Sequence, residues 1–224
     1  MTEATYMARE LLLISGLPGS GKSHLGKELA RHAPRELGVS AEHISSGDRI
    51  RLISILGRAS LSPETNTTIA EHMRSDKRAL PLSDLVMREV IGDALIEKHR
   101  TDMLILDGYP RNIAQLEHLQ ELALFEEREL TGAIVTEAPY DVMLSRLIKR
   151  GPRSENEYMD PFMANLRISS QQPHLSDLHQ HLLLDPNKRL HLQYVSTDGE
   201  KTASIREGIE AVRTMHLYRN GDDI

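Results

Sequence analysis

One motif constrains this chain of 224 residues more than any other feature of its sequence. Residues 16–23 read Gly-Leu-Pro-Gly-Ser-Gly-Lys-Ser and lie between the apolar run 11–14 and the helix-compatible residues 22–32. This is the spacing of the phosphate-binding P-loop, and the pattern requires a strand before it and a helix after it. The alternative is a glycine-rich turn without a ligand. The context favours the P-loop, so the motif predicts an α/β fold that binds phosphate.

Each part of this motif has a chemical reason. Glycines let the backbone fold tightly around phosphate oxygens, so that successive N–H groups and the helix N-terminus face the anion. Lys22 supplies a positive charge, and Ser23 supplies a hydroxyl group for Mg²⁺. The residues expected at the phosphates are Gly16, Pro18, Gly19, Ser20, Gly21, Lys22 and Ser23.

The rest of the chain alternates between strand and helix patterns. Besides residues 11–14, apolar runs of strand length occupy residues 103–106, 132–135 and 190–195. Helical patterns follow at residues 49–57, 64–76, 83–99, 113–124, 140–149, 161–181 and 202–215. Such alternation predicts a parallel sheet covered on both faces. Residues 46–78 and 151–160 lack strands and are interpreted as insertions over the carboxyl edge of the sheet, where ligands bind.

Composition excludes several classes of protein. The net charge is −6 with acidic and basic residues interspersed, which gives no broad basic surface for nucleic acid or an anionic membrane. The absence of cysteine excludes disulfides and thiolate zinc clusters and fits a reducing compartment. The apolar run 11–14 is too short for a signal peptide or a membrane span. We therefore expect a cytoplasmic protein with neither a nucleic acid nor a membrane as partner.

Two further motifs extend the pattern. Residues 103–111 read Met-Leu-Ile-Leu-Asp-Gly-Tyr-Pro-Arg, and residues 43–51 read His-Ile-Ser-Ser-Gly-Asp-Arg-Ile-Arg. Together with the P-loop they resemble, in order and spacing, the signatures of adenylate kinases and related nucleoside monophosphate kinases. The resemblance continues through residues 83–95, the region of Arg146 and residues 196–199, and so covers nearly the whole chain.

This resemblance implies an architecture. It is a single P-loop kinase domain, residues 1–224, with three α/β/α layers around a five-stranded parallel sheet. A helical insertion, residues 46–80, would bind the nucleoside monophosphate, and a short lid insertion, residues 150–160, would close over the site. Because the chain has no cysteine, the lid cannot be of the zinc-bearing kind. The usual state of the family is a monomer.

The resemblance also implies roles for residues of the second and third motifs. Asp107, at the end of a strand beside the P-loop, would hold Mg²⁺, whereas the alternative is an aspartate that caps a turn. Gly108 of the same motif is expected in the nucleotide site. Arg51 and Arg111 would grip the acceptor monophosphate with planar guanidinium groups. The alternative for both arginines is a surface salt bridge.

A third set of arginines follows the segment 140–149. Arg146 and Arg150 are four residues apart, hence on one helix face, and Arg153 lies just beyond the end of the helix. In the related kinases, matching arginines neutralise charge on the transferring group, and Arg167 matches a further arginine after the lid. The alternative is that these cations favour a helix C-terminus, and this is the interpretation we keep for Lys149.

Two residues, Gln115 and Ser46, are expected near the acceptor nucleotide, and only Gln115 indicates which base it carries. Gln115 stands four residues after Arg111, where adenylate kinases have a glutamine that reads adenine and pyrimidine relatives tend to have asparagine. A side-chain amide can pair with the donor and acceptor edge of adenine. A solvated helix residue is the alternative for Gln115. Ser46 is also expected at the base or monophosphate, but does not decide between bases.

The predicted function is Mg²⁺-dependent transfer of the γ-phosphoryl group of ATP to AMP, which gives two ADP. The acceptor phosphate has a second pKa of about 6, so it is an anionic nucleophile near neutral pH and needs no catalytic base. Two alternatives stay open. One is a kinase for another acceptor, such as UMP, CMP or a small hydroxyl metabolite. The other is a nucleotide-binding sensor that has lost transfer.

Overall fold

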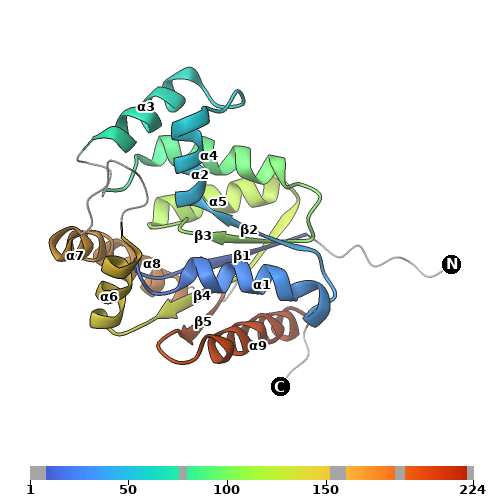
Figure 1. Cartoon of the computed structure of the whole chain (residues 1–224). Coiled ribbons are helices and arrows are strands. Elements are labelled where there is room, and N and C mark those ends of the chain that lie inside the picture. The colour runs from blue at the N-terminus through green and yellow to red at the C-terminus, as the bar shows by residue number, and fades with distance from the viewer. Residues whose placement is uncertain (1–8, 76–79, 152–159, 185–189, 221–224) are drawn as a thin grey trace.

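A computed structural model describes residues 9–75, 80–151, 160–184 and 190–220. Five parallel strands form one sheet in the order β2-β3-β1-β4-β5, with helices on both faces (Figure 1). The strands are β1 (Arg9–Ser15), β2 (Ala41–Ser45), β3 (Met103–Asp107), β4 (Arg128–Glu137) and β5 (His191–Ser196). The three-layer α/β fold with a five-stranded parallel sheet is therefore confirmed.

The helices begin and end close to the predicted bounds, with one exception. They are α1 (Lys22–Glu36), α2 (Ser46–Leu56), α3 (Pro63–Arg74), α4 (Asp84–Glu97), α5 (Ile113–Phe125), α6 (Tyr140–Arg150), α7 (Pro161–Ser169), α8 (Gln172–Leu183) and α9 (Lys201–Asn220). The prediction of one helix over residues 161–181 is wrong. Pro173 lies in the first turn of α8 and has no N–H to donate to the Ser169 carbonyl, so a continuous helix would lack that bond.

The sheet is buried on both faces because side chains alternate along each strand. Leu11 and Leu13 of β1 belong to a cluster with residues of α4, α5 and α8. Leu12 and Ile14 belong to a second cluster with residues of α1 and α9, which lie on the opposite face in Figure 1. This double burial explains why the central strands are continuous apolar runs.

One strand, β2, falls outside the four apolar runs found in the sequence. It is an edge strand that pairs only with β3, and within it only Ile44 is buried. Three of its five residues, Glu42, His43 and Ser45, are polar, so Ala41–Ser45 contains no apolar run of strand length. Its register nonetheless places Ser45 beside Asp107, and so brings the start of α2 to the end of β3.

The helical segment after β2 has a small hydrophobic core of its own. α2, α3 and α4 share a cluster of five buried residues: Ile53, Leu61, Ile69, Val86 and Val90. In Figure 1, α3 lies outermost, beyond α2 and α4. The segment is helical as predicted, while a monophosphate-binding role for residues 46–80 stays a prediction. Most of the predicted lid, together with Arg153, lies outside the described residues.

None of the helices in the described ranges combines the length and the apolar composition needed to cross a bilayer.

Candidate active site

The carboxyl ends of three strands meet at one edge of the sheet. In the register, Ile14 of β1 and Ser45 of β2 both pair with Asp107 of β3. The P-loop, the start of α2 and the turn at Gly108 therefore lie together, as expected for neighbouring parallel strands. They open into a cavity of about 380 Å³, a size that holds a small-molecule ligand.

Most of the predicted site residues line this one cavity. They are Gly16, Pro18, Gly19, Gly21, Lys22, Ser23, Ser46, Arg51, Asp107, Gly108, Arg111, Gln115, Arg146, Arg150 and Arg167. Ser20 is an exception, because it is buried and its hydroxyl group lies 2.7 Å from Oγ1 of Thr136. The side chain of Ser20 thus fastens the loop to β4. Arg153 lies outside the described residues.

The P-loop backbone requires glycine at its tightest point. Gly19 has a φ of 88°, and a Cβ atom there would lie 2.5 Å from the carbonyl oxygen of Met143. A side chain would therefore be excluded twice, by backbone conformation and by contact. Gly21 also has a positive φ, 93°, and caps the start of α1. The loop consequently presents backbone N–H groups beside the helix N-terminus, as an anion site does.

Side chains from the far edge of the sheet hold this loop in place. Thr197, which follows β5, donates from Oγ1 to the carbonyl oxygen of Ser20 at 2.6 Å. Arg146 of α6 donates to Oγ1 and to the carbonyl oxygen of Thr197, at 3.1 and 2.5 Å, and to the carbonyl oxygen of Gly19 at 3.3 Å. The guanidinium group of Arg146 is therefore held against the P-loop while it lines the cavity.

Ser23 and Asp107 form a compact pair of oxygen ligands. Oγ of Ser23 donates to Oδ2 of Asp107 at 2.5 Å, and Nε2 of His43, whose side chain is 6% exposed, lies 3.6 Å from the same oxygen. Burial disfavours the charged carboxylate, but the polar contacts of His43 and Ser23 and the charge of Lys22 outweigh it and hold the pKa of Asp107 below its ordinary value. Asp107 is thus an anion at neutral pH.

This pair fits a hard divalent cation. Mg²⁺ prefers oxygen ligands, and at nucleotide sites it is commonly held by one or two protein oxygens while phosphates and water complete its shell. Within the described ranges, no group of three or more His, Asp or Glu side chains could hold a metal ion alone. Ser23 and Asp107 would hold Mg²⁺ as two of its oxygen ligands.

The wall opposite the P-loop contains an unusual hydroxyl group. Ser46 is completely buried, and its Oγ has no hydrogen-bond partner among the described residues. Gly108 has a φ of 81°, and a Cβ atom there would lie 2.6 Å from this oxygen. Since buried polar groups are almost always paired, the Ser46 hydroxyl is an exception beside the cavity.

Two arginines stand on this wall. Nε of Arg111 donates to the carbonyl oxygen of Gly108 at 2.8 Å, which turns its guanidinium group along the cavity. Burial lowers the pKa of Arg111, and the charge of Asp107 partly opposes this. Arg51 forms an ion pair with Asp48, one helical turn before it. The two arginines therefore lie at one cavity, as predicted, while their contact with a monophosphate stays a prediction.

Gln115 is a buried residue, and the alternative of a solvated helix position is wrong. Only 3% of it is exposed. Its backbone N–H donates to Oδ1 of Asn112 at 2.8 Å, its Oε1 accepts from the N–H of Arg111 at 2.8 Å, and its Nε2 donates to Oδ1 of Asp84 at 2.6 Å. Its side chain lines the cavity beside Arg111. Whether it reads a base stays a prediction.

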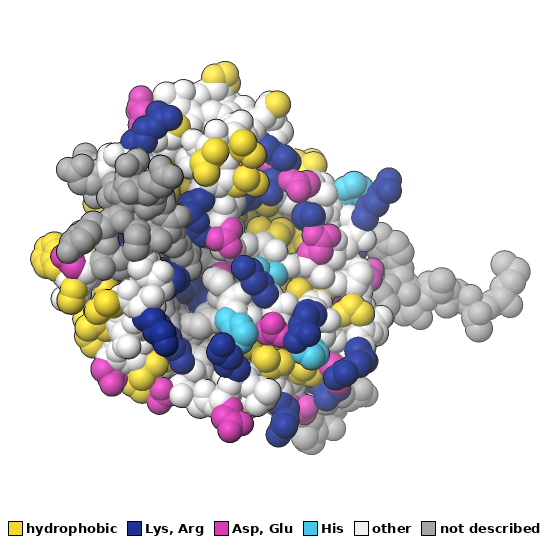
Figure 2. All heavy atoms as spheres, viewed as in Figure 1, with side chains coloured by type: hydrophobic (Ala, Val, Ile, Leu, Met, Phe, Trp, Pro, Cys, Tyr) yellow, Lys and Arg dark blue, Asp and Glu magenta, His cyan; other side chains and the backbone are white. Residues whose placement is uncertain are grey.

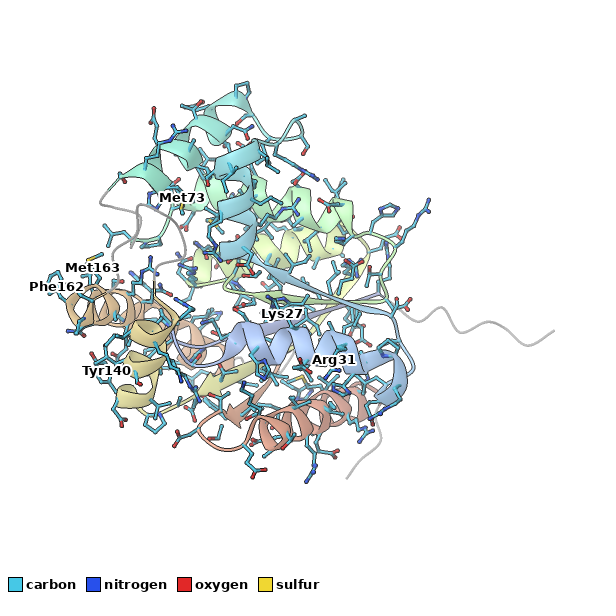
Figure 3. All side chains as sticks on the ribbon, in the orientation of Figure 1. Lys27, Arg31, Met73, Tyr140, Phe162 and Met163 are labelled. Carbon is cyan, nitrogen blue, oxygen red and sulfur yellow. The ribbon has the colours of Figure 1, made fainter. Side chains whose placement is uncertain are left out.

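The helices α6 and α7 bring further arginines to the cavity. Tyr140 of α6, labelled in Figure 3, donates from its hydroxyl group to Oδ1 of Asn165 on α7 at 2.6 Å. Arg150, at the end of α6, and Arg167 of α7 both line the cavity. Met73 of α3 lines it as well and lies on the side of α3 that faces α7 (Figure 3).

Outside the cavity, charges of both signs are mixed. The face in Figure 2 shows basic and acidic side chains side by side. Arg31 of α1, for example, pairs with Glu28, and Arg213 of α9 pairs with Glu36. The several arginines that line the cavity are therefore a local concentration of positive charge, as the sequence predicts for an anion site.

Sequence reasoning missed several residues that position the site. Thr136 lies directly after the predicted strand 132–135, where a polar residue at the end of a strand was a usable signal. His43 and Asp84 lie in segments that carry the resemblance, but no role was predicted for either residue. A lone histidine in a polar strand has no ligand pattern, and the contact of Asp84 with Gln115 joins residues that are 31 positions apart.

Known proteins are similar to this chain in sequence. A family model described as AAA domain matches residues 15–161, more than half of the chain. The adenylate kinase of Thermotoga petrophila is 34% identical over 139 residues, 62% of this chain and 57% of that protein. The adenylate kinase of Corynebacterium glutamicum is 29% identical, over 65% of this chain and 73% of the relative. That of Prochlorococcus marinus is 26% identical, over 86% and 93%. The chain thus spans 57% of the length of the Thermotoga relative that it matches.

Proposed function

Because the chain belongs to the P-loop family that the AAA domain model describes and, within it, to the adenylate kinases and related nucleoside monophosphate kinases, we propose that it transfers the γ-phosphoryl group of ATP to AMP. The proposed partners are thus a nucleoside triphosphate and a nucleoside monophosphate. A monomer in the cytoplasm is part of the same proposal. So is closure of residues 46–80 and 150–160 over the bound nucleotides.

One observation carries this proposal. The P-loop, the Ser23 and Asp107 pair, and the arginines of a second wall all line a single cavity. A protein that only bound a nucleoside triphosphate would need the first two features. The second wall, with Arg51 and Arg111, would suit a second anionic ligand beside the first.

The proposed chemistry needs alignment and charge neutralisation rather than a base. The P-loop and Lys22 would hold the donor phosphates, and Arg111 the acceptor phosphate, so that the two react within one site. Mg²⁺, held by Ser23 and Asp107, would supply charge neutralisation at the donor phosphates. Arg146, Arg150 and Arg153 would neutralise charge on the group in transfer.

The choice of AMP rests on Gln115. Its amide lines the cavity on the same wall as Arg111, where it can pair with the edge of a base. The names of the relatives agree with this choice, since each is an adenylate kinase. Transfer to UMP, CMP or a small hydroxyl metabolite is the second candidate, and binding without transfer is the third.

A panel of acceptors tests the proposal. The full chain is incubated with ATP and Mg²⁺ and, in separate reactions, with AMP, CMP, UMP, GMP, dTMP or shikimate, and the products are quantified by chromatography. We expect ADP to form fastest with AMP and its formation to stop when Mg²⁺ is chelated. Faster transfer to another acceptor would overturn the choice of AMP, and no phosphorylated acceptor with ATP still bound would overturn transfer altogether.

A further inference from the structure

The side-chain amide of Gln115 is held in one orientation. Its Oε1 accepts from the backbone N–H of Arg111 at 2.8 Å, and its Nε2 donates to Oδ1 of Asp84 at 2.6 Å. A backbone N–H can only donate and a carboxylate can only accept. These two neighbours together decide which end of the amide is oxygen and which is nitrogen.

Turning the amide over would be unfavourable at both ends. It would place the Gln115 NH₂ group against the N–H of Arg111, and the carbonyl oxygen against the carboxylate of Asp84. Two hydrogen bonds would be lost at a residue that is only 3% exposed, and the groups left facing each other would repel. The alternative orientation is therefore suppressed for as long as Asp84 is in place.

Asp84 is itself fixed. It lies in the first turn of α4, directly after the cap residue Ser83. Nδ2 of Asn112, the cap residue of α5, lies 3.3 and 3.4 Å from its two carboxylate oxygens. The carboxylate thus joins the beginnings of two helices, and its bond to Nε2 holds the Gln115 side chain where α5 meets the cavity.

After these bonds, the amide of Gln115 has one N–H and one carbonyl lone pair left for a ligand in the cavity that it lines. This donor and acceptor pair matches a base that carries an amino group beside an unprotonated ring nitrogen, as adenine and cytosine do. Guanine, uracil, thymine and hypoxanthine present the reverse pattern, a carbonyl oxygen beside a ring N–H. An amide free to turn over would accept either class.

We infer that Asp84 is a specificity-determining residue, which selects amino-bearing acceptor bases by fixing the orientation of the Gln115 amide. The inference rests on the proposed function, since it assigns the base of the acceptor in that reaction. Asp84 acts through Gln115 and touches no substrate, so it is a positioning residue. The choice of base would then depend on Asp84, which lies outside the three motifs at residues 16–23, 43–51 and 103–111.

AMP and IMP are the sharpest pair of probes. They share ring size, sugar and phosphate, and differ only at the base edge that the amide would read. We compare kcat/KM for the two acceptors in the wild type, Asp84→Ala and Asp84→Asn. We expect the wild type to favour AMP, and the ratio of AMP to IMP to fall about tenfold or more in Asp84→Ala, from the loss of one hydrogen bond to a charged group.

The Asp84→Asn variant keeps an acceptor oxygen of the same shape and should therefore retain more of the discrimination than Asp84→Ala. It also keeps the test decisive if Asp84→Ala does not fold. The matched control is Asp141→Ala, which removes an acidic residue from the first turn of another helix, α6. A loss of favourable charge at a helix N-terminus is common to both variants, but only Asp84 contacts Gln115.

The results separate this inference from the proposed function. A wild type that uses AMP and IMP equally, or an Asp84→Ala variant that folds and keeps the wild-type ratio, overturns the inference and leaves transfer intact. An equal drop in the ratio in Asp141→Ala also overturns it. A wild type that phosphorylates no monophosphate overturns the proposed function, which is a different outcome. An unchanged KM for ATP in Asp84→Ala supports an effect confined to the acceptor.

Discussion

The two walls of the cavity are built in different ways. The P-loop is fastened to the central sheet by Thr136, at the end of β4, and by Thr197, which follows β5. The opposite wall is carried in part by α2 and α3, which rest on α4 through the small cluster around Ile69 and through ion pairs to Asp93. The first wall is part of the main core, whereas the α2 and α3 part of the second has a small core of its own.

This difference implies that the two walls can be weakened separately. We call the second wall the acceptor wall. A change in the small cluster should disturb it before the P-loop, because that cluster contains no residue of β1 or α1. Elements with few buried apolar contacts are also those that open most easily in folded proteins. The acceptor wall is therefore the part of the site that we expect to move.

Arg111→Ala should give the largest effect, because it removes a positive charge from the acceptor wall of the cavity. We expect transfer to AMP to fall about a thousandfold, the scale seen for arginines that stabilise phosphoryl transfer. Steady-state rates and ATP binding are measured together. ATP affinity should change little, since Arg111 lies on the acceptor wall, and turnover at the wild-type rate would remove Arg111 from the site.

Ile69→Ala should sharpen the comparison by loosening the acceptor wall alone. Ile69 is completely buried in the cluster of α2, α3 and α4, and truncation of such a residue costs about 2–5 kcal/mol. We expect KM for AMP to rise while ATP affinity is kept. Hydrogen exchange should increase in α2 and α3 first.

The matched control is Ile134→Ala, at an equally buried isoleucine of β4 in the main core. It should lower the stability of the whole chain and affect both nucleotides. If Ile69→Ala and Ile134→Ala raised exchange in the same helices and strands, the two walls would not be separate units.

Asp93→Asn tests the ion pairs that carry the acceptor wall. Asp93 accepts hydrogen bonds from Arg49, Arg58 and Ser60. Burial would raise its pKa, but these bonds outweigh burial and hold the pKa of Asp93 below its ordinary value of about 3.9. We expect the free energy of unfolding of the variant to be about 2 kcal/mol lower than that of the wild type, because hydrogen bonds to a charged group are lost.

The pH dependence of this loss has a definite sign. A carboxylate with a lowered pKa stabilises the folded state above its ordinary pKa, and this stabilisation disappears as the pH falls through the lowered value. The difference in Tm between the wild type and Asp93→Asn should thus be constant near neutral pH and shrink below about pH 3.9. A difference that stayed constant in acid would show that the charge of Asp93 does not contribute.

The smallest effect should come from Arg31→Ala, which is also the control for Arg111→Ala. Arg31 lies on the outer side of α1 (Figure 3) and pairs with Glu28 one turn away. Exposed pairs of this kind contribute little, because water and salt screen them. We expect Tm and transfer to remain within experimental error of the wild type, and a large loss of transfer would extend the site to this face.

Prediction from sequence succeeded where the information is local. The P-loop and the segment from Asp107 to Arg111 are contiguous motifs, so their residues reach the same edge of the sheet once the strands are parallel. The edge strand β2 was not among the predicted strands because it has no apolar run. The break between α7 and α8 was missed because it depends on Pro173, and the spacing of apolar residues does not reveal a proline effect.

Prediction failed where a contact joins distant segments. Ser20 and Thr136 are 116 positions apart, and Asp84 and Gln115 are 31 apart. Their pairing depends on how the helices pack on the sheet, and no spacing rule encodes it. The same holds for Gln115, whose burial could not be told from a solvated position until α4 was placed beside α5.

The most direct test of the account is a single-turnover reaction with ATP labelled at the γ-phosphate, Mg²⁺, excess protein and AMP. If the two walls align two nucleotides, the label should appear in the β-phosphate of newly formed ADP, with little free phosphate. Label that appeared only as inorganic phosphate, or stayed in ATP that is bound to the protein, would contradict the claim that this cavity joins a donor to an acceptor.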